Sequence, residues 1–282
     1  MVAILNSWGT KPKQPLWFRS PVTFFAFLSY CCLAGWLGLA GGWNTSAQAD
    51  ATPATPLAGL AEFARRAEKT YLTNKIRFET QTNNAQAAWQ FGQACYDWAD
   101  FASSNRQREE LAKQGIAACR ALIERDPGSA PGHYYLALNL GQLAQTKKLG
   151  ALKLVGQMEG EFKTTLGLDP QLDFAGSDRG LGLLYFEAPG WPTSIGSKSK
   201  ARQHLQKAVK LAPDYPENQL NVIEADLKWG EKNSALRELK VLDELWPRAQ
   251  KKLVGEEWAT CWADWEARRA AAKSKVPAVP SR

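Results

Sequence analysis

Asp178 and Arg179 are the adjacent charged residues of this 282-residue chain that are best suited to polar chemistry. A guanidinium can hold a carboxylate through two parallel hydrogen bonds, so Arg179 could clamp an anion in a groove. In the alternative, Asp178 stabilises the positive end of a helix and Arg179 forms a structural ion pair. The sequence is compatible with both roles.

The residue types and spacings that catalysis or metal binding needs are otherwise missing from the sequence. It has no nucleophile elbow, glycine-rich phosphate loop, paired-carboxylate motif or Cys-x-x-Cys pair, and its only histidines are His133 and His204. Gly180 and Gly182 lack the third glycine of a dinucleotide fingerprint, so we expect them to serve helix packing. The sequence therefore predicts a protein that is not an enzyme and that holds no cofactor and no metal.

A segment rich in proline and glycine, residues 188–197, is a second candidate for binding. Trp191 stands between two prolines there, and long ordered loops are often functional, so the segment could form a wall or lid over a groove. Alternatively, Trp191 packs over the end of a helix pair. Ser197 is expected to cap the following helix. The exposed cations at its start, Lys198 and Lys200, could mark an acidic or phosphate partner or be solvated surface charge.

The elements that position these residues follow from a spacing that recurs four times. Three residues are separated by four and three positions, and a proline follows five positions later. The first steps place three side chains on one helix face, and proline cannot continue a helix. Such units must stack to bury their apolar faces, which predicts an all-α superhelix, a solenoid of about four helical hairpins. The sets are Gly115, Cys119, Leu122 and Pro127; Met158, Phe162, Thr165 and Pro170; Ala201, Leu205, Ala208 and Pro213; and Ala235, Leu239, Leu242 and Pro247.

Apolar periodicity and capping residues predict the helix boundaries. Asn83 and Asn84 can cap the helix that follows them, and Ser103 to Asn105 precede the start of the next one. After Pro247 a final helix is expected to run to about Lys273, with a stripe of Trp258, Trp262 and Trp265 that caps the exposed core. The other predicted helices span about 57–72, 85–102, 106–125, 131–145, 152–168, 177–188, 198–211, 217–229 and 232–245.

The N-terminal segment has the order of a secretory signal peptide. Residues 1–49 contain three basic and no acidic residues, with an apolar stretch at 24–40 and the small-residue motif Ala47–Ala49 before Asp50. The alternative is an uncleaved membrane anchor at 22–40. We predict an exported protein, periplasmic or secreted, that meets a membrane only through an uncleaved N-terminal segment.

The expected domain organisation follows directly. Residues 1–49 are the signal peptide or anchor, 50–56 a linker, 57–273 the helical-repeat domain and 274–282 a disordered tail.

The cysteines and the net charge restrict the possible disulfides and the class of partner. Cys95, Cys119 and Cys261 remain outside the leader. Export permits a disulfide between Cys95 and Cys119, which fall on the two helices of one hairpin, and the alternative is that they are buried free thiols. The formal net charge of +7 includes no dense run of lysine and arginine, so we expect no nucleic-acid partner.

The hairpins resemble the tetratricopeptide repeat (TPR) family over residues 85–247. Leu181, Gly182 and Tyr185 match the first helix of its pattern in the third hairpin, and Trp89 and Tyr96 match it in the first. In that family the first helix of each pair lines a concave face. The resemblance therefore implies a groove lined by Tyr134, Leu138, Arg179, Phe186, Leu220 and Glu224. Trp191 of the insert is a further candidate for contact with the partner.

Residues 173–182, 188–189 and 195–202 are also similar to the periplasmic T-component associated with TRAP-type transporters. This resemblance implies a helical-repeat accessory protein, a homo-oligomer that forms a trimer and partners a substrate-binding protein. In this chain we expect Arg179 to contact a small anionic ligand. Two functions are thus open. The first is an exported, non-enzymatic module that binds a peptide or protein partner in a concave groove, and the second is the transporter-associated ligand binder.

Overall fold

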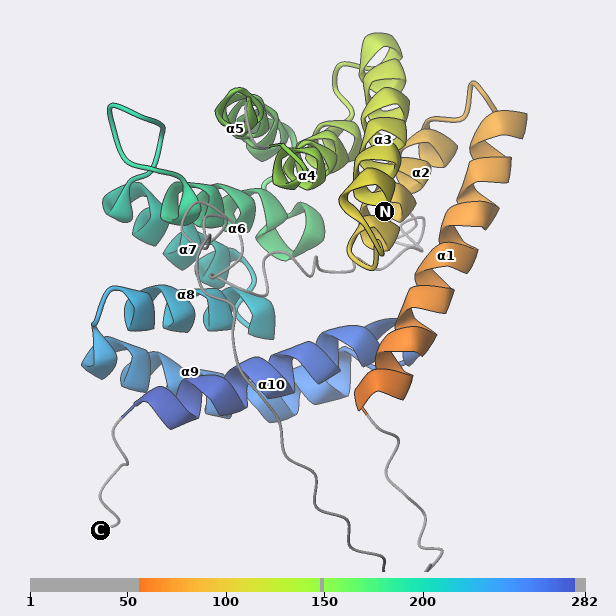
Figure 1. The fold of residues 1–282 in the computed structure, drawn as a ribbon. Coiled ribbons are helices and arrows are strands. Elements are labelled where there is room, and N and C mark those ends of the chain that lie inside the picture. The colour runs from red at the N-terminus through yellow and green to blue at the C-terminus, as the bar shows by residue number, and fades with distance from the viewer. Residues whose placement is uncertain (1–55, 148–149, 277–282) are drawn as a thin grey trace, which may run out of the picture.

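The computed structural model describes residues 56–147 and 150–276, and within these ranges the chain is almost entirely helical (Figure 1). The predicted leader, the linker up to residue 55, and residues 277–282 of the expected tail lie outside the described residues. The helices are α1 (Pro56–Thr80), α2 (Ala85–Ala99), α3 (Asn105–Arg125), α4 (Ala130–Gln145), α5 (Ala151–Leu168), α6 (Leu172–Glu187), α7 (Lys198–Leu211), α8 (Pro216–Lys228), α9 (Lys232–Lys252), the short 3₁₀ helix η3 (Glu256–Trp258) and α10 (Ala259–Lys275).

Successive helices pack as antiparallel neighbours and form the predicted all-α solenoid. The pairs α2–α3, α4–α5, α6–α7 and α8–α9 are the four hairpins, and each hairpin also packs on the next. Figure 1 shows these helices following one another around an arc, with α1 at one end and α8 to α10 at the other. No described helix is both long and apolar enough to cross a membrane.

The recurring spacing identifies the inner face of the second helix of each hairpin. All twelve non-proline residues of the four sets are buried. The matching glycine of the first helix allows close approach: a Cβ on Gly182 would stand 2.7 Å from the Cγ atom of Leu205. Small residues on one helix and large ones on its neighbour thus fill the space between them.

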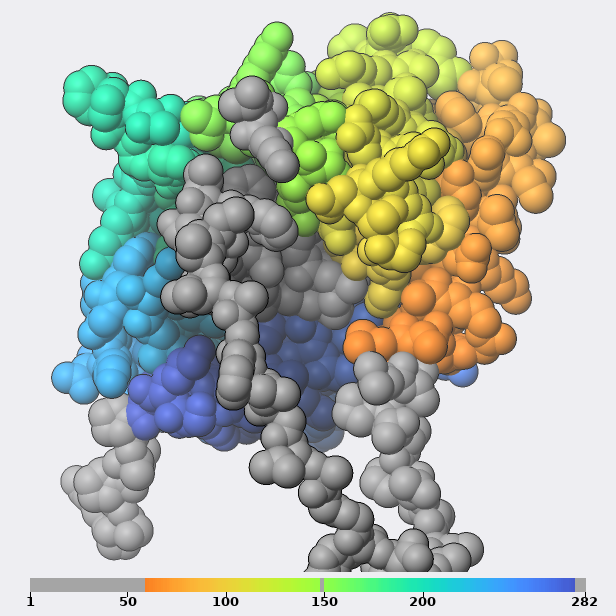
Figure 2. Space-filling view, in the orientation of Figure 1, coloured from red at the N-terminus to blue at the C-terminus, as the bar shows by residue number. Residues whose placement is uncertain are grey.

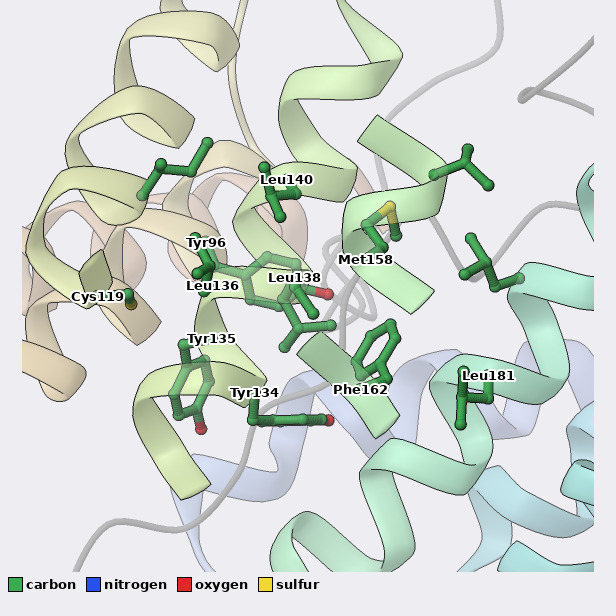
Figure 3. Packing of buried hydrophobic residues seen from close by; sticks show 14 of the residues in the cluster. Tyr96, Cys119, Tyr134, Tyr135, Leu136, Leu138, Leu140, Met158, Phe162 and Leu181 are labelled. Atoms are coloured by element: carbon green, nitrogen blue, oxygen red, sulfur yellow. The ribbon is translucent and has the colours of Figure 1, made fainter. Parts of the chain in front are cut away.

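The largest part of the core joins the first three hairpins (Figure 3). Tyr134 and Tyr135 of α4 form an edge-to-face pair with ring centroids 5.2 Å apart, and Phe162 of α5 lies 6.0 Å from Tyr134. Cys119 and Leu181 border the same cluster from α3 and α6. The apolar face of each hairpin is therefore covered by the next hairpin, as a solenoid requires.

Polar side chains start the helices where the sequence predicts caps. The Oδ1 atom of Asn84 accepts a hydrogen bond from the Ala87 amide at 3.1 Å, and Ser104 caps α3 through the Gln107 amide at 3.2 Å. Ser197 caps α7 through the Lys200 amide at 3.4 Å. Each cap satisfies one of the amides that a helix start leaves without a partner.

Pro247 does not end its helix, and the prediction that it closes the fourth hairpin is wrong. α9 continues through Pro247 to Lys252. The apolar stripe explains the difference, because Leu245, Trp246 and Ala249 are all buried on both sides of the proline. Burial of this stripe outweighs the lost backbone hydrogen bond, whereas the other three prolines follow the ends of their helices.

Further boundaries also differ from prediction. α6 begins at Leu172 rather than at about residue 177, and its residues 173–175 are left-handed. α1 extends to Thr80 rather than to about residue 72, because Tyr71 and Phe78 pack on the rings of α2. α10 starts at Ala259 and runs to Lys275, so the expected tail begins inside a helix.

The C-terminal tryptophans cap the superhelix as predicted. Trp258 and Trp265 are buried, and Trp262 packs edge-to-face on Trp246 with centroids 5.3 Å apart. The indole of Trp265 donates to the Glu217 carboxylate at 2.6 Å. α10 thereby packs on α8 and α9 and shields the apolar side chains at this end of the superhelix from water.

Candidate functional site

Arg179 is buried and fully engaged inside the protein. Its Nη2 atom forms an ion pair with Asp173 Oδ2 at 2.6 Å, and its Nη1 atom donates to Asn218 Oδ1 at 3.1 Å. The guanidinium also lies over the ring of Tyr215, 5.4 Å from its centroid. Arg179 therefore forms a structural ion pair, and its partner is Asp173.

A left-handed turn at the start of α6 brings Asp173 to Arg179. Asp173, Phe174 and Ala175 have φ values of 52°, 53° and 63°, a conformation that costs non-glycine residues about 1–2 kcal/mol each. Arg179 holds the turn by donating to the carbonyl oxygens of Phe174 at 3.2 Å and Asp173 at 3.1 Å. The Asn218 amide donates to the Phe174 oxygen as well, at 3.0 Å.

Burial and the opposite charge of the partner act against each other in the Asp173–Arg179 pair. Burial raises the pKa of the Asp173 carboxyl. Burial is the largest single influence and would lower the pKa of Arg179, but the charge of Asp173 acts together with Tyr134, Tyr215 and Glu217, and the net pKa of Arg179 is raised. The phenol of Tyr134 completes the group by donating to Asp173 Oδ2. The arrangement is a polar clamp between hairpins, and all of its side chains are committed to one another.

The other predicted groove residues divide into buried and accessible positions. Leu138 and Leu220 are buried in the core, where they hold helices together. Glu224 is partly exposed but binds Arg268, with its two carboxylate oxygens each 2.8 Å from the guanidinium. Phe186 is half-buried at the C-terminal end of α6. The structure therefore does not bring the predicted residues together on one surface.

The insert at 188–197 forms a projecting loop between α6 and α7 (Figures 1 and 2). Its base is held by backbone hydrogen bonds, from the Gly196 amide to the Pro189 oxygen at 2.8 Å and from the Ser197 amide to the Tyr185 oxygen at 2.9 Å. Gly196 is required there, since a Cβ atom would run into the carbonyl oxygen of Ala188.

Trp191 is 89% exposed on this loop, the highest value among the large hydrophobic side chains of the described residues. It does not pack over the end of the hairpin, so that alternative is wrong. A large aromatic side chain held in water by a preorganised loop is suited to entering a pocket on a partner, because little conformational entropy is lost on binding.

Aromatic rings and cations lie at the same end of the hairpins. Phe186 and Trp229 pack edge-to-face with centroids 5.6 Å apart. Lys228 stands 4.6 Å from the centroid of Phe186, and Lys198 stands 5.1 Å from that of Trp229. We call Phe186, Trp191 and Trp229 the aromatic edge. Trp229 was not predicted as a site residue. It could have been found from its position, because it directly precedes Gly230 at the end of the first helix of its hairpin, as Phe186 does in the previous hairpin.

The cysteines of the described residues, Cys95, Cys119 and Cys261, are buried and free. Cys95 and Cys119 form no disulfide in the structure, and Cys261 is buried in the C-terminal core. Burial raises the pKa of Cys95 and of Cys119, which disfavours the reactive thiolate. Among the described residues, no group of three or more His, Cys, Asp or Glu side chains could hold a metal ion.

Comparison with known proteins agrees with this architecture. The crystal structure of a thermophilic TPR protein from Thermus thermophilus superposes with a TM-score of 0.53 at 16% sequence identity, covering 77% of this chain and 96% of that one. The fold is TPR-like. The family model described as regulator of microtubule dynamics protein 1-3 matches residues 60–158, about a third of the chain. No curated protein sequence matches significantly.

A TPR-like superhelix is a scaffold that presents surface along stacked hairpins.

Proposed function

We propose that this TPR-like chain is an exported, non-enzymatic module that binds a protein or peptide partner, and that the aromatic edge is its contact surface. Exposure of Trp191 on a preorganised loop carries the proposal. Binding energy at protein interfaces concentrates in a few aromatic and arginine side chains that enter desolvated pockets.

The cations near the aromatic edge favour a partner with acidic groups around such a pocket. Residues 188–200 contain Lys198 and Lys200 and no acidic residue. Lys198 is also paired with Glu231 at 2.7 Å, so the charge at this end is moderate and steers the partner rather than supplying most of the affinity.

The alternative function, a transporter-associated binder of a small anion, gains no support from Arg179. Its guanidinium is buried and already paired with Asp173. The printed name of the matching family refers to microtubules, but the match ends at residue 158, before the loop that carries Trp191. The partner that we propose is therefore a protein or a peptide.

Photo-crosslinking tests the contact. A photoreactive amino acid at Trp191 in the full chain should yield a discrete crosslinked protein in the native host. That protein is then purified and its affinity measured against wild type and Trp191→Ala, which we expect to bind at least about 10-fold more weakly. Leu168→Ala, a change at another exposed apolar residue, is the matched control and should bind like wild type. Equal binding by Trp191→Ala would place the contact elsewhere.

Export is tested separately. Cell fractionation followed by N-terminal sequencing should find a mature chain that begins at Asp50. A chain that remains intact in the membrane fraction would favour the anchor at 22–40, and an intact soluble cytoplasmic chain would contradict export.

A further inference from the structure

α1 presents an unusual outer face for the terminal helix of a solenoid. Its inner face is fully used, because Tyr71 packs on Trp98 with centroids 4.5 Å apart and Phe78 stacks on Phe91 at 5.1 Å. On the opposite face Leu72 is 50% and Ile76 62% exposed. These residues are one helical turn apart, so they form a single apolar patch turned away from the rest of the molecule.

The charges around this patch are arranged symmetrically. Lys69 lies five positions before the midpoint of Leu72 and Ile76, and Glu79 lies five positions after it. Both side chains are exposed on the same side of α1 as the patch. Glu79 forms a loose ion pair with Lys75, 3.9 Å away along the same helix.

This pattern is self-complementary. If two α1 helices meet antiparallel about a two-fold axis at that midpoint, Leu72 of each copy faces Ile76 of the other. The same operation brings Lys69 of each copy opposite Glu79 of the other, which gives two ion pairs and no clash of like charges at these positions. A two-fold interface must use one patch twice in this way.

We propose that α1 is a homodimerisation surface in which the Leu72–Ile76 patches of two copies pack antiparallel. A membrane is a poorer match, because this face mixes Arg65 and Lys69 with Glu68 and Glu79 instead of being uniformly basic. A contact between single helices is smaller than the roughly 800 Å² per partner of a standard interface, so the dimer is expected to be weak, on the order of micromolar.

The proposal concerns a different surface from the aromatic edge and does not depend on the proposed function. Sedimentation of the purified full chain over a concentration series, from about 1 µM to about 100 µM, should show a monomer–dimer equilibrium. Ile76→Glu should weaken association at least about 10-fold. Leu152→Glu is the matched control, because Leu152 is 41% exposed on α5, and it should associate like wild type.

The charge pairs provide the decisive test of register. Lys69→Glu and Glu79→Lys should each weaken the dimer, because each places like charges opposite one another, and the double variant should restore it. Helical circular dichroism confirms that each variant is folded. A chain that stays monomeric throughout, a dimer that Ile76→Glu leaves intact, or a double variant without recovery would each overturn the proposal.

Discussion

At the scale of single residues, the polar clamp around Arg179 is the feature with the largest expected effect on stability. Arg179→Met should destabilise the protein by about 3–5 kcal/mol, because it leaves the buried Asp173 carboxylate without its partner. Urea unfolding monitored by tryptophan fluorescence measures the change. Arg106→Met, at an arginine that is 90% exposed, should alter stability by less than about 0.5 kcal/mol.

A second variant separates the ion pair from the shape of the clamp. Asp173→Asn combined with Arg179→Met removes both charges and should cost less than Arg179→Met alone. An equal or larger loss would mean that the left-handed turn depends on the guanidinium itself, through its bonds to the carbonyl oxygens of Asp173 and Phe174.

The partner of Arg179 could not be predicted from sequence spacing. In a continuous right-handed helix, residues six positions apart such as Asp173 and Arg179 do not face each other, whereas the adjacent Asp178 could stabilise the helix start. The left-handed turn places Asp173 back against Arg179, and none of its three left-handed residues is a glycine or an asparagine. Asp178 instead accepts from His204, 2.7 Å away on α7.

At the scale of elements, Pro247 offers a direct test of why α9 continues. Pro247→Ala restores a backbone amide inside the helix and should stabilise the protein by about 2 kcal/mol. This value is the gain in helix propensity less the entropy that the unfolded chain regains when proline is removed. Thermal unfolding measures it. Pro213→Ala, beyond the end of α7, should have no such benefit. A destabilised Pro247→Ala variant would show that the proline fits a local bend.

The docking of α10 should depend on pH through Glu217. Burial is the largest single influence and would raise the pKa of Glu217. Arg268, whose Nη1 atom lies 2.7 Å from the Glu217 carboxylate, acts together with Arg179 and the Trp265 indole, and the net pKa is lowered. The stabilising contribution is therefore complete above the unfolded pKa of about 4.3 and is lost as the pH falls through the folded value.

Urea unfolding at a series of pH values should show this loss in the wild type. Glu217→Gln should be less stable near neutral pH and should lose less on acidification, because it lacks the titrating group. Glu110→Gln, at an exposed carboxylate, is the control and should follow the wild-type profile. Parallel acid profiles for wild type and Glu217→Gln would contradict the role of this carboxylate.

The sequence predicted the helices and hairpins much better than it predicted which side chains lie on a common surface. The hairpin pattern and the caps at Asn84 and Ser197 are local rules, and the structure confirms them. Whether a side chain lines a groove depends instead on how the hairpins stack. Leu138 and Leu220 lie on the first helices of their hairpins as expected, yet neighbouring hairpins cover them. Spacing within one helix does not carry that information.

At the scale of the whole molecule, the two ends of the superhelix meet. Arg66 of α1 approaches Glu256 of η3, with its Nη1 atom 3.5 Å from the carboxylate and 3.5 Å from the carbonyl oxygen. The two side chains are 37% and 85% exposed. An ion pair this exposed contributes little to stability and is screened by salt, so the contact should open readily.

Arg66→Ala should therefore leave the midpoint of thermal unfolding nearly unchanged while it loosens the arc. Electron–electron distance measurements between spin labels at Ala61 and Val254, both exposed, should give a broader distribution in Arg66→Ala and in wild type at high salt. A label pair on α3 and α5 should stay unchanged, because the core of the first three hairpins holds these helices together. If wild type and Arg66→Ala give the same narrow distribution, packing rather than this ion pair sets the curvature, and the superhelix presents one fixed surface to its partners.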